Sequence, residues 1–443
     1  MSERNKKYII FTYGCQMNVH DSEKLAGMLV KLGYSETADV KEADIAVFNT
    51  CCIRDNAEHR AIGNIGALKK QKEKNRDMII AVVGCMTQQD GAAEDLIKKL
   101  PFIDIVLGTA NTHLLEENII KVLNSKQKKR LKVCDTFMPK MPEVNEAVLP
   151  YRTSGCNAWV NIVYGCNNFC TYCIVPYVRG RERSREPEMI ISEIKLLLAS
   201  GYKEITLLGQ NVNSYGSDRS DGWNFAKLLK EIAKIDTKFR LRFMTSHPKD
   251  LTQEVVEIMA TSKNFMPYIH LPVQSGSTKV LRDMNRKYTK EHYIGLIEMI
   301  RSIIPNCGIT TDIMVGFPTE TEEDAQETAD LMKIGQFGSA FTFVYSPRKG
   351  TPAADMVQLS DEVKIARIQK LIEIQQEITQ KQSESLIGSV CEVLCENISK
   401  NGKIAGRSEQ GRLVECDGSA SIGDFVNVKI TGAGLSKLRG VII

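Results

Sequence analysis

At residues 165–180 the chain reads Gly165-Cys166-Asn167-Asn168-Phe169-Cys170-Thr171-Tyr172-Cys173-Ile174-Val175-Pro176-Tyr177-Val178-Arg179-Gly180. The three cysteines follow a CxxxCxxC spacing. Three soft thiolates so close together suit three corners of an iron–sulfur cube and leave the fourth iron without a protein ligand. A structural zinc site is the alternative, but it needs a fourth ligand, and Cys156 and His247 both lie at unsuitable spacings. The stretch therefore predicts an iron–sulfur cluster with one open coordination site.

The CxxxCxxC motif resembles the signature of the radical S-adenosylmethionine (SAM) superfamily. The residues after it, Ile174-Val175-Pro176-Tyr177 and then Arg179-Gly180, resemble the methylthiotransferase branch. This resemblance implies that Cys166, Cys170 and Cys173 hold a [4Fe–4S] cluster. It also implies that SAM chelates the open iron and is cleaved there to methionine and a carbon-centred radical.

Composition limits the class of protein. The chain has 443 residues, of which 25% are charged and 43% hydrophobic, with a net charge of +4. This length predicts two or three domains. The sequence has no apolar run of membrane-spanning length and no signal-like start, and its 13 cysteines favour metal or redox chemistry over disulfides. We therefore expect a cytoplasmic protein with no membrane contact.

Residues 1–150 alternate strand-like and helix-like segments, which predicts an α/β domain with a doubly wound parallel sheet. Each of the first three predicted strands is followed by a cysteine, namely Cys15, Cys51 and Cys85. Because the carboxyl ends of parallel strands meet at one edge, we expect these thiols to share a site. The alternative is that each is a small buried apolar residue.

The sequence words around these cysteines are YGCQMN, NTC and VVGC, and they resemble the amino-terminal domain of the methylthiotransferases. The resemblance implies that Cys15, Cys51 and Cys85 hold a second, auxiliary [4Fe–4S] cluster. Cys52 adjoins Cys51 and is taken as a spare thiol.

Residues 151–380 repeat strand and helix six times, which predicts a partial (βα)6 barrel. Active-site residues of such barrels follow the carboxyl ends of the strands. The words LLGQNVNSYG, TSHP, HLPVQSGS and DIMVGFPTET resemble the same family. His247 is a candidate acid–base group. The candidates for SAM binding are Gln210, Asn211, Ser246, Gln274, Ser275, Arg286 and Asp312.

Two sets of cations that precede the terminal segment are candidates for RNA contact. Arg179, Arg181, Arg183 and Arg185 follow the cluster motif and predict a phosphate-binding surface. The basic run 126–132 is either a further RNA contact or a solvated loop.

Residues 381–443 read as five short strands separated by glycine turns, which predicts a small antiparallel barrel of the kind that binds single-stranded nucleic acid. The segment resembles the TRAM domain, an RNA-binding module. Lys403 and Arg407 are its candidate RNA contacts.

Together the resemblances cover all three domains. They imply a radical SAM methylthiotransferase that adds a methylthio group to C2 of N6-isopentenyladenosine at position 37 of tRNA, next to the anticodon. We expect the protein to be a monomer. The implied partners are the tRNA anticodon stem-loop, a flavodoxin- or ferredoxin-like electron donor and a sulfur donor of unknown identity. The alternatives are a threonylcarbamoyladenosine tRNA methylthiotransferase, a ribosomal-protein aspartate methylthiotransferase and, from a different class, a non-catalytic iron–sulfur RNA-binding protein.

Overall fold

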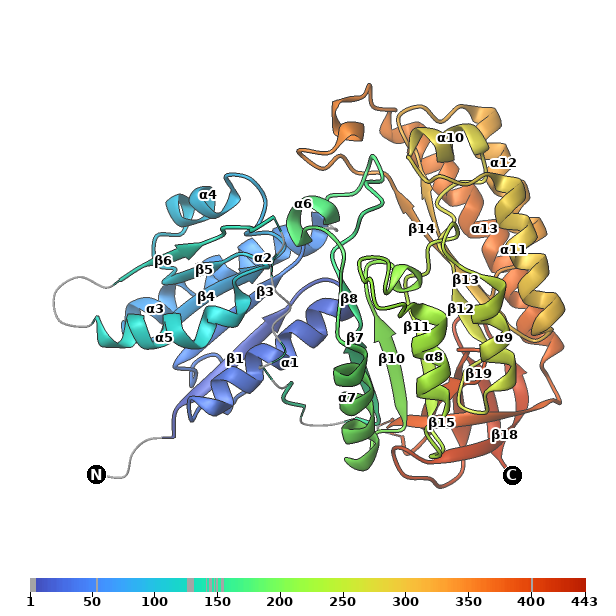
Figure 1. Cartoon of the computed structure of the whole chain (residues 1–443), viewed down its shortest axis with the longest axis horizontal. Coiled ribbons are helices and arrows are strands. Elements are labelled where there is room, and N and C mark those ends of the chain that lie inside the picture. The colour runs from blue at the N-terminus through green and yellow to red at the C-terminus, as the bar shows by residue number, and fades with distance from the viewer. Residues whose placement is uncertain are drawn as a thin grey trace. The chain divides into compact units, whose positions relative to one another are not determined.

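The computed structural model describes residues 5–52, 55–125, 131–140, 142, 146, 148, 150–152, 155–399 and 401–443. The chain forms two compact units (Figure 1). The first contains residues 1–153, 164–167 and 173–183, and the second contains residues 154–163, 168–172 and 184–443. The TRAM-like segment therefore shares a unit with the predicted barrel, and parts of the cysteine motif belong to the first unit.

The first unit is built on a parallel sheet with the strand order β2-β1-β3-β4-β5-β6. The strands are β1 (Lys7–Thr12), β2 (Ser35–Glu36), β3 (Ile45–Thr50), β4 (Ile79–Gly84), β5 (Ile105–Leu107) and β6 (Val133–Asp135). The helices are α1 (Gln16–Lys31), α2 (Asp55–Ala67), α3 (Lys69–Lys74), α4 (Ala92–Lys99), η1 (Thr112–Leu114) and α5 (Leu115–Asn124). The sequence pattern does not predict the short strands β2 and β6.

Both faces of this sheet are buried. Side chains alternate along β3, so that Ile45 and Val47 face the core formed with α1 and α5. Ala46 and Phe48 face the core formed with α2 and α4. A strand covered on both faces is apolar throughout, which explains why β3 and β4 read as continuous hydrophobic runs. The doubly wound α/β prediction is confirmed.

The second unit contains six parallel strands in two groups, β11-β10-β7 and β12-β13-β14. Leu241 and Phe265 form an isolated bridge beside β11. The strands are β7 (Asn157–Asn161), β10 (Glu204–Leu208), β11 (Arg240–Phe243), β12 (Tyr268–His270), β13 (Gly308–Val315) and β14 (Ser339–Val344). The helices are α7 (Pro187–Ala199), η2 (Val212–Ser214), α8 (Phe225–Ala233), α9 (Gln253–Thr261), α10 (Thr278–Asp283), α11 (Lys290–Ile303), α12 (Glu322–Gly335) and η3 (Pro352–Asp355). This arrangement is the predicted partial (βα)6 barrel.

The cysteine motif lies among three short elements, β8 (Val163–Tyr164), α6 (Val175–Arg179) and β9 (Arg183–Ser184). Gly165 has φ = +75°, and a Cβ there would lie 2.1 Å from the carbonyl oxygen of Arg181. Only glycine fits this turn.

The helix α13 (Asp361–Ser385) begins at the cap residue Ser360, whose hydroxyl accepts a hydrogen bond from the backbone N–H of Val363. It contacts α12 and β14 and then β18 of the terminal barrel. One uninterrupted helix of 25 residues therefore serves both parts of the second unit.

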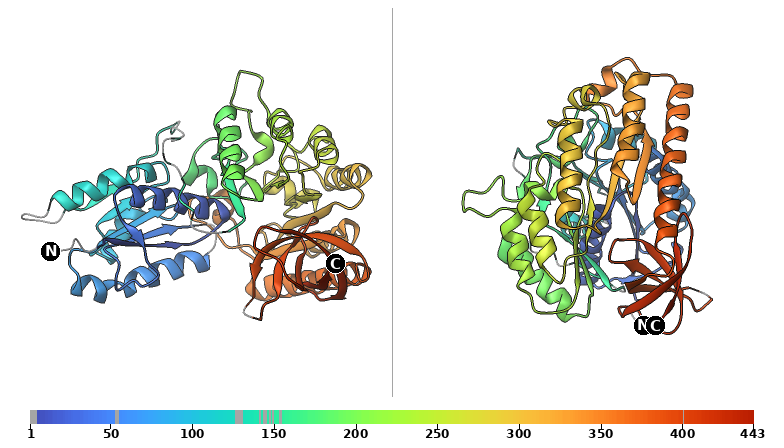
Figure 2. Two further views of the ribbon diagram at one scale, coloured as in Figure 1. Left: turned by 90° about the horizontal axis from the view of Figure 1, so that it is seen from below. Right: turned by 90° about the vertical axis from the view of Figure 1, so that its right-hand side faces the viewer.

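The carboxyl-terminal strands close into a barrel of order β15-β16-β17-β19-β18 (Figure 2). They are β15 (Val390–Ile398), β16 (Ile404–Ser408), β17 (Leu413–Asp417), β18 (Phe425–Ala433) and β19 (Leu438–Ile442). The predicted small barrel is confirmed, with one correction: β17 and β19 pair in parallel. No helix in the described part of the chain is long and apolar enough to cross a membrane.

Candidate functional site

The cysteines predicted to form the auxiliary site lie at one edge of the first unit's sheet. Cys15 is the cap residue of α1, directly after β1, while Cys51 and Cys85 follow the neighbouring strands β3 and β4. Asn18 of α1 connects this edge to the end of β3, because its side-chain amide donates to the carbonyl of Thr50 at 2.9 Å. The backbone N–H of Cys85 donates to the same carbonyl at 3.0 Å. The fold thus brings these three residues to adjacent strand ends, as the sequence predicts.

Two glycines leave room for this cysteine edge. A Cβ on Gly14, which has φ = +114°, would lie 2.8 Å from the sulfur of Cys51. A Cβ on Gly84, which has φ = +107°, would lie 2.5 Å from the carbonyl oxygen of Thr50. Both positions require glycine because of conformation and because of space.

Cys52 is more than a neighbour of Cys51 in the sequence. Its thiol is buried and donates a hydrogen bond to Cys85, which is the largest cause that lowers the pKa of Cys85. Burial opposes this effect, and the positive charge of Arg179 adds to it. The same hydrogen bond raises the pKa of Cys52. Cys85 is therefore the thiol of this pair that becomes a thiolate first.

The edge suits an anionic iron–sulfur cluster in its chemistry. Soft thiols gather at adjacent strand ends, and a buried guanidinium, that of Arg179, points at one of them with its Nε 3.3 Å from Cys85 Sγ. In the described residues, however, no three Cys, His, Asp or Glu side chains converge in the arrangement of metal ligands. The strand ends and the nearby charge fit the cluster that the sequence predicts, so the assignment of its ligands stays a prediction.

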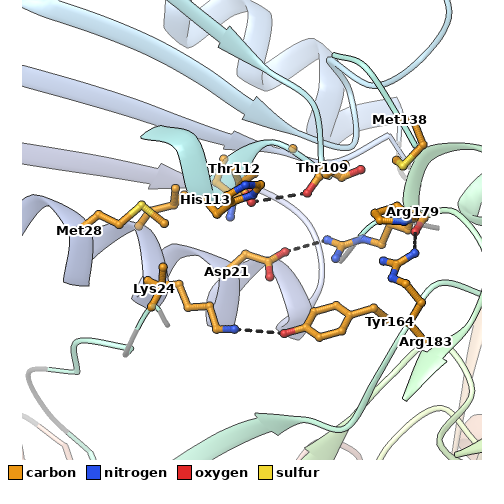
Figure 3. Close-up of a pocket in the computed structure, with 16 residues that line it drawn as sticks. Asp21, Lys24, Met28, Thr109, Thr112, His113, Met138, Tyr164, Arg179 and Arg183 are labelled. Atoms are coloured by element: carbon orange, nitrogen blue, oxygen red, sulfur yellow. Dashed lines mark hydrogen bonds and ion pairs between the residues drawn. The ribbon is translucent and has the colours of Figure 1, made fainter. Parts of the chain in front are cut away.

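A solvent-open pocket borders this edge (Figure 3). Its wall carries three cationic side chains, Lys24, Arg179 and Arg183, and one carboxylate, Asp21. Lys24 donates to the hydroxyl of Tyr164 at 3.1 Å, and Arg179 pairs with Asp21 at 2.9 Å. This wall of the pocket therefore carries a net positive charge.

The cysteines of the CxxxCxxC motif have well-defined surroundings. In the first unit, the backbone N–H of Cys166 donates to Gly180 O at 3.1 Å, and the Cys173 residue lies just before α6. In the second unit, Nη1 of Arg286 lies 3.6 Å from Cys170 Sγ. Arg286 also donates to the carbonyl of Pro272 at 2.8 Å. Arg286, predicted as a SAM contact, thus lies beside a predicted cluster ligand.

Unpartnered polar groups collect at the carboxyl ends of the strands of the second unit. Both side-chain amide atoms of Asn161 and Asn213, the hydroxyl of Ser246 and Oε1 of Gln274 are buried and have no hydrogen-bond partner in the described structure. These residues follow or end β7, β10, β11 and β12. A buried polar group without a partner costs free energy, and such groups in a barrel are typical of a site built for a polar ligand. They fit SAM, with its amino acid, ribose and adenine parts.

The structure places the other SAM candidates differently. Asn211 is bound within the protein: it donates to Asp250 at 2.6 Å and accepts from the N–H of His247. Ser275 accepts from the N–H of Ser277 at 3.2 Å. Asp312 pairs with His270 at 3.5 Å. Their side chains hold the strand ends in place, whereas Gln210 follows β10 and is half-buried.

His247 does not act as a charged group. Burial, followed by the positive charge of Arg286, lowers the pKa of His247 far below its ordinary value. Its Nε2 has no partner among the described residues. The imidazole is therefore a neutral hydrogen-bonding group, and the predicted acid–base role is not favoured.

The predicted arginine surface needs correction. Arg179 and Arg185 are 8% and 4% exposed, and their guanidinium groups bind Asp21 and Glu193, respectively. A buried arginine that is already paired cannot reach a phosphate. Arg181 is exposed and Arg183 is half-buried, so a phosphate contact stays a prediction for these two alone. Of the basic run 126–132, residues 126–130 lie outside the described part of the chain.

The cations of the terminal barrel are paired with acids. Lys403 pairs with Asp417 at 3.2 Å, and Arg407 binds Glu396. The side chains of Lys403 and Arg407 are 41% and 38% exposed. Because exposed ion pairs are weak, a phosphate group can replace Asp417 beside Lys403, whereas Glu396 beside Arg407 is only 17% exposed. Both residues remain candidates for RNA contact.

Comparison with known proteins gives three family matches. The Radical SAM superfamily matches residues 160–332, the family described as "Uncharacterized protein family UPF0004" matches residues 7–108, and the TRAM domain matches residues 384–443. A relative from Caldicellulosiruptor saccharolyticus, named tRNA-2-methylthio-N(6)-dimethylallyladenosine synthase, is 51% identical over 99% of this chain and 93% of its own length. The chain belongs to the tRNA-2-methylthio-N(6)-dimethylallyladenosine synthase family. A second member of this synthase family, from Clostridium botulinum (strain Langeland), is 51% identical over 98% of this chain and 96% of its own length.

A solved structure has a fold similar to that of this member of the synthase family. The radical SAM methyltransferase TsrM from Kitasatospora setae, solved with cobalamin and a [4Fe–4S] cluster, matches 79% of this chain and 74% of its own chain with a TM-score of 0.59. The identity is 13%, so the likeness concerns the fold alone.

Sequence reasoning missed two features of the site. It names no role for Asn161, although an asparagine at the end of an apolar strand is itself a signal of a polar site. It assigns Arg179 to RNA because the basic residues after the motif form one group in the sequence. The contact of Arg179 with Cys85 joins residues 94 positions apart, which no local pattern reveals.

Proposed function

We propose that this protein is a radical SAM methylthiotransferase that converts N6-isopentenyladenosine at position 37 of tRNA into its 2-methylthio derivative. The observation that carries the proposal is the 51% identity, over almost the whole chain, to relatives named for this synthase activity. The cysteine edge of the first unit and the unpartnered polar groups of the second support it independently.

In this proposal two cluster sites are present. Cys166, Cys170 and Cys173 hold the cluster that binds SAM, and Cys15, Cys51 and Cys85 hold the auxiliary cluster. The clusters, when bound, supply one-electron and sulfur chemistry that side chains do not have, which an unactivated aromatic C–H bond requires. The unpartnered groups of Asn161, Asn213, Ser246 and Gln274 orient SAM.

Residues of the chain perform the remaining tasks. The target base must leave its stack to be modified, so the protein has to hold the flanking backbone. We assign this role to Arg181, Arg183, Lys403 and Arg407, none of which is fully buried. The proposed partners are the tRNA anticodon stem-loop and a flavodoxin- or ferredoxin-like electron donor, and the proposed form is a monomer in the cytoplasm.

The test is mass spectrometry of nucleosides from isopentenylated tRNA after anaerobic incubation with the cluster-reconstituted protein, SAM and a reductant. The expected product is the 2-methylthio derivative, and a Cys85→Ala variant should give none. Cleavage of SAM with an unchanged nucleoside would overturn the substrate and direct the test to threonylcarbamoyladenosine tRNA and to ribosomal protein. Absence of SAM cleavage would favour the non-catalytic RNA-binding alternative.

A further inference from the structure

Arg179 is the one buried cation whose hydrogen bonds, in the described structure, connect a predicted auxiliary cluster ligand to the rest of the first unit. It ends α6 and is 8% exposed. Its Nε donates to Cys85 Sγ at 3.3 Å, and its Nη2 donates to Asn18 Oδ1 at 3.2 Å and to Asp21 Oδ2 at 2.9 Å. Three fixed acceptors hold the plane of the guanidinium (Figure 3 shows the pair with Asp21).

Arg179 donates to one sulfur atom, that of Cys85, and to two side-chain oxygen atoms, those of Asn18 and Asp21. Asp21 supplies one negative charge and is 23% exposed at its side chain, whereas Cys85 is buried. Burying a guanidinium is costly unless every partner is in place. A charge kept at this cost beside a sulfur is suited to balance negative charge that develops on sulfur and iron.

The backbone around Arg179 is also fixed to the cysteine edge. Ile174 and Val178 of the same segment pack with Cys52 and Cys85. The hydroxyl of Thr109 donates to the carbonyl of Val178. Arg179 therefore has little freedom to leave Cys85, and its direction is set before any cluster is bound.

We propose that Arg179 is a positioning residue of the auxiliary iron–sulfur centre, which directs the sulfur of Cys85 and raises the reduction potential of the cluster bound there. The inference rests on the proposed function in one respect, the presence of that cluster. Hydrogen bonds to ligand sulfurs and net charge near the cluster are among the factors that set its potential. A cation stabilises the reduced cluster, which is the more negative form, and Asp21 partly offsets this effect.

The experiment uses the full chain with Cys166, Cys170 and Cys173 replaced by alanine, so that only the auxiliary cluster is reconstituted. Its potential is measured by redox titration followed by electron paramagnetic resonance. Arg179→Met should shift the ratio of reduced to oxidised cluster at a fixed potential at least tenfold towards oxidised, which is about 59 mV for a one-electron couple. Asp21→Asn should shift the ratio in the opposite direction, because it leaves the charge of Arg179 uncompensated.

Shifts of opposite sign in the two variants would separate an effect of charge on the potential from a general disturbance of the fold. Arg179→Lys keeps the charge and should recover most of the potential, even where the hydrogen-bond geometry is lost. Arg152→Met is the matched control: the side chain of Arg152 is 8% exposed, and it pairs at 2.8 Å with Glu23 of α1, the helix that also carries Asp21. This control should leave the potential unchanged.

The outcomes distinguish the two proposals. If the chain with Cys166, Cys170 and Cys173 replaced by alanine binds no cluster, the proposed auxiliary site is wrong, and so is the inference about Arg179. If the cluster is present and its potential is the same in the Arg179→Met variant, or moves in the same direction in the Asp21→Asn variant, the inference alone is overturned. Shifts of opposite sign with recovery by lysine support it.

Discussion

Arg240 fastens the terminal barrel to the strands of the second unit. It lies on β11, is 4% exposed, and donates from Nη1 to the carbonyl of Arg407 and from Nη2 to that of Glu392 at 2.8 Å. Its guanidinium also lies 5.4 Å from the ring centroid of Phe425. We predict that Arg240→Met loosens the terminal barrel from β11.

The magnitude follows from the two hydrogen bonds that the substitution removes. Each hydrogen bond from a charged donor contributes about 1.5–3 kcal/mol, so two such bonds contribute about 3–6 kcal/mol. The lower bound corresponds to roughly a 100-fold change in a local opening equilibrium, at about 1.4 kcal/mol per tenfold. We therefore expect amide hydrogens of β15 and β18 to exchange about 100-fold faster in the variant where exchange occurs by local opening.

Lys238→Met is the matched control. Lys238 contacts the same two residues, since it pairs with Glu392 and lies 4.5 Å from the ring centroid of Phe425, but its side chain is 64% exposed. An exposed pair of this kind contributes about 0–1 kcal/mol, so exchange in β15 and β18 should change less than about fivefold. Equal exchange rates in the Arg240 and Lys238 variants, measured by mass spectrometry, would refute the reasoning.

Three further predictions concern the two sites and the stability of the chain. Gly14→Ala should prevent assembly of the auxiliary cluster, measured as iron per chain after reconstitution, because the added Cβ meets Cys51. Ser246→Ala should weaken SAM binding by about 0.5–1.5 kcal/mol in calorimetry, without loss of stability, because its hydroxyl has no partner in the described structure. Asp324→Asn should destabilise the chain at neutral pH. Burial raises the pKa of Asp324, but hydrogen bonds, the first of them from Ser277, outweigh this and lower it to about 2. The stabilisation is therefore present above the ordinary pKa and is lost as the pH falls through about 2.

The controls for these predictions lie in the same chain. Gly33→Ala is the control for Gly14→Ala. Gly33 also has a positive φ, +83°, but a Cβ added there would meet no atom within 4 Å, so this variant should keep its iron content. Ser277→Ala removes the cap of α10 and a 2.6 Å bond to Asp324, and should lower stability while SAM affinity is retained. In urea unfolding, the gap between wild type and Asp324→Asn should close towards pH 2. A gap that widens there contradicts the assigned sign.

Much of the fold was predictable because its signals are local. The alternation of strand-like and helix-like segments over residues 1–150 and 151–380 predicts the parallel sheet and the partial barrel that the structure contains. The strands β2 and β6 were missed because a strand of two or three residues has no detectable periodicity. The parallel pairing of β17 with β19 arises from the way the barrel closes and cannot be read from the sequence of either strand.

The same distinction applies to the site. The edge that holds Cys15, Cys51 and Cys85 was predictable because parallel strands end together. The roles of Arg179 and Asn211 were not, since each depends on a partner distant in sequence: Cys85 for Arg179 and Asp250 for Asn211. A charged residue in the sequence indicates only that it needs a partner. The folded structure is required to tell whether that partner is RNA or another side chain.

The helix α13 has a consequence for how this protein can be rebuilt. A single helix that packs on α12 and β14 and also on β18 cannot be exchanged like a flexible linker. Its buried polar residues are specific, since Gln375 donates to the carbonyl of Phe337 at 2.9 Å. A TRAM segment grafted from a distant relative should therefore be joined after Ser385, so that this chain's own α13 is retained, and it should fold properly only where its counterpart of β18 preserves the contact with α13.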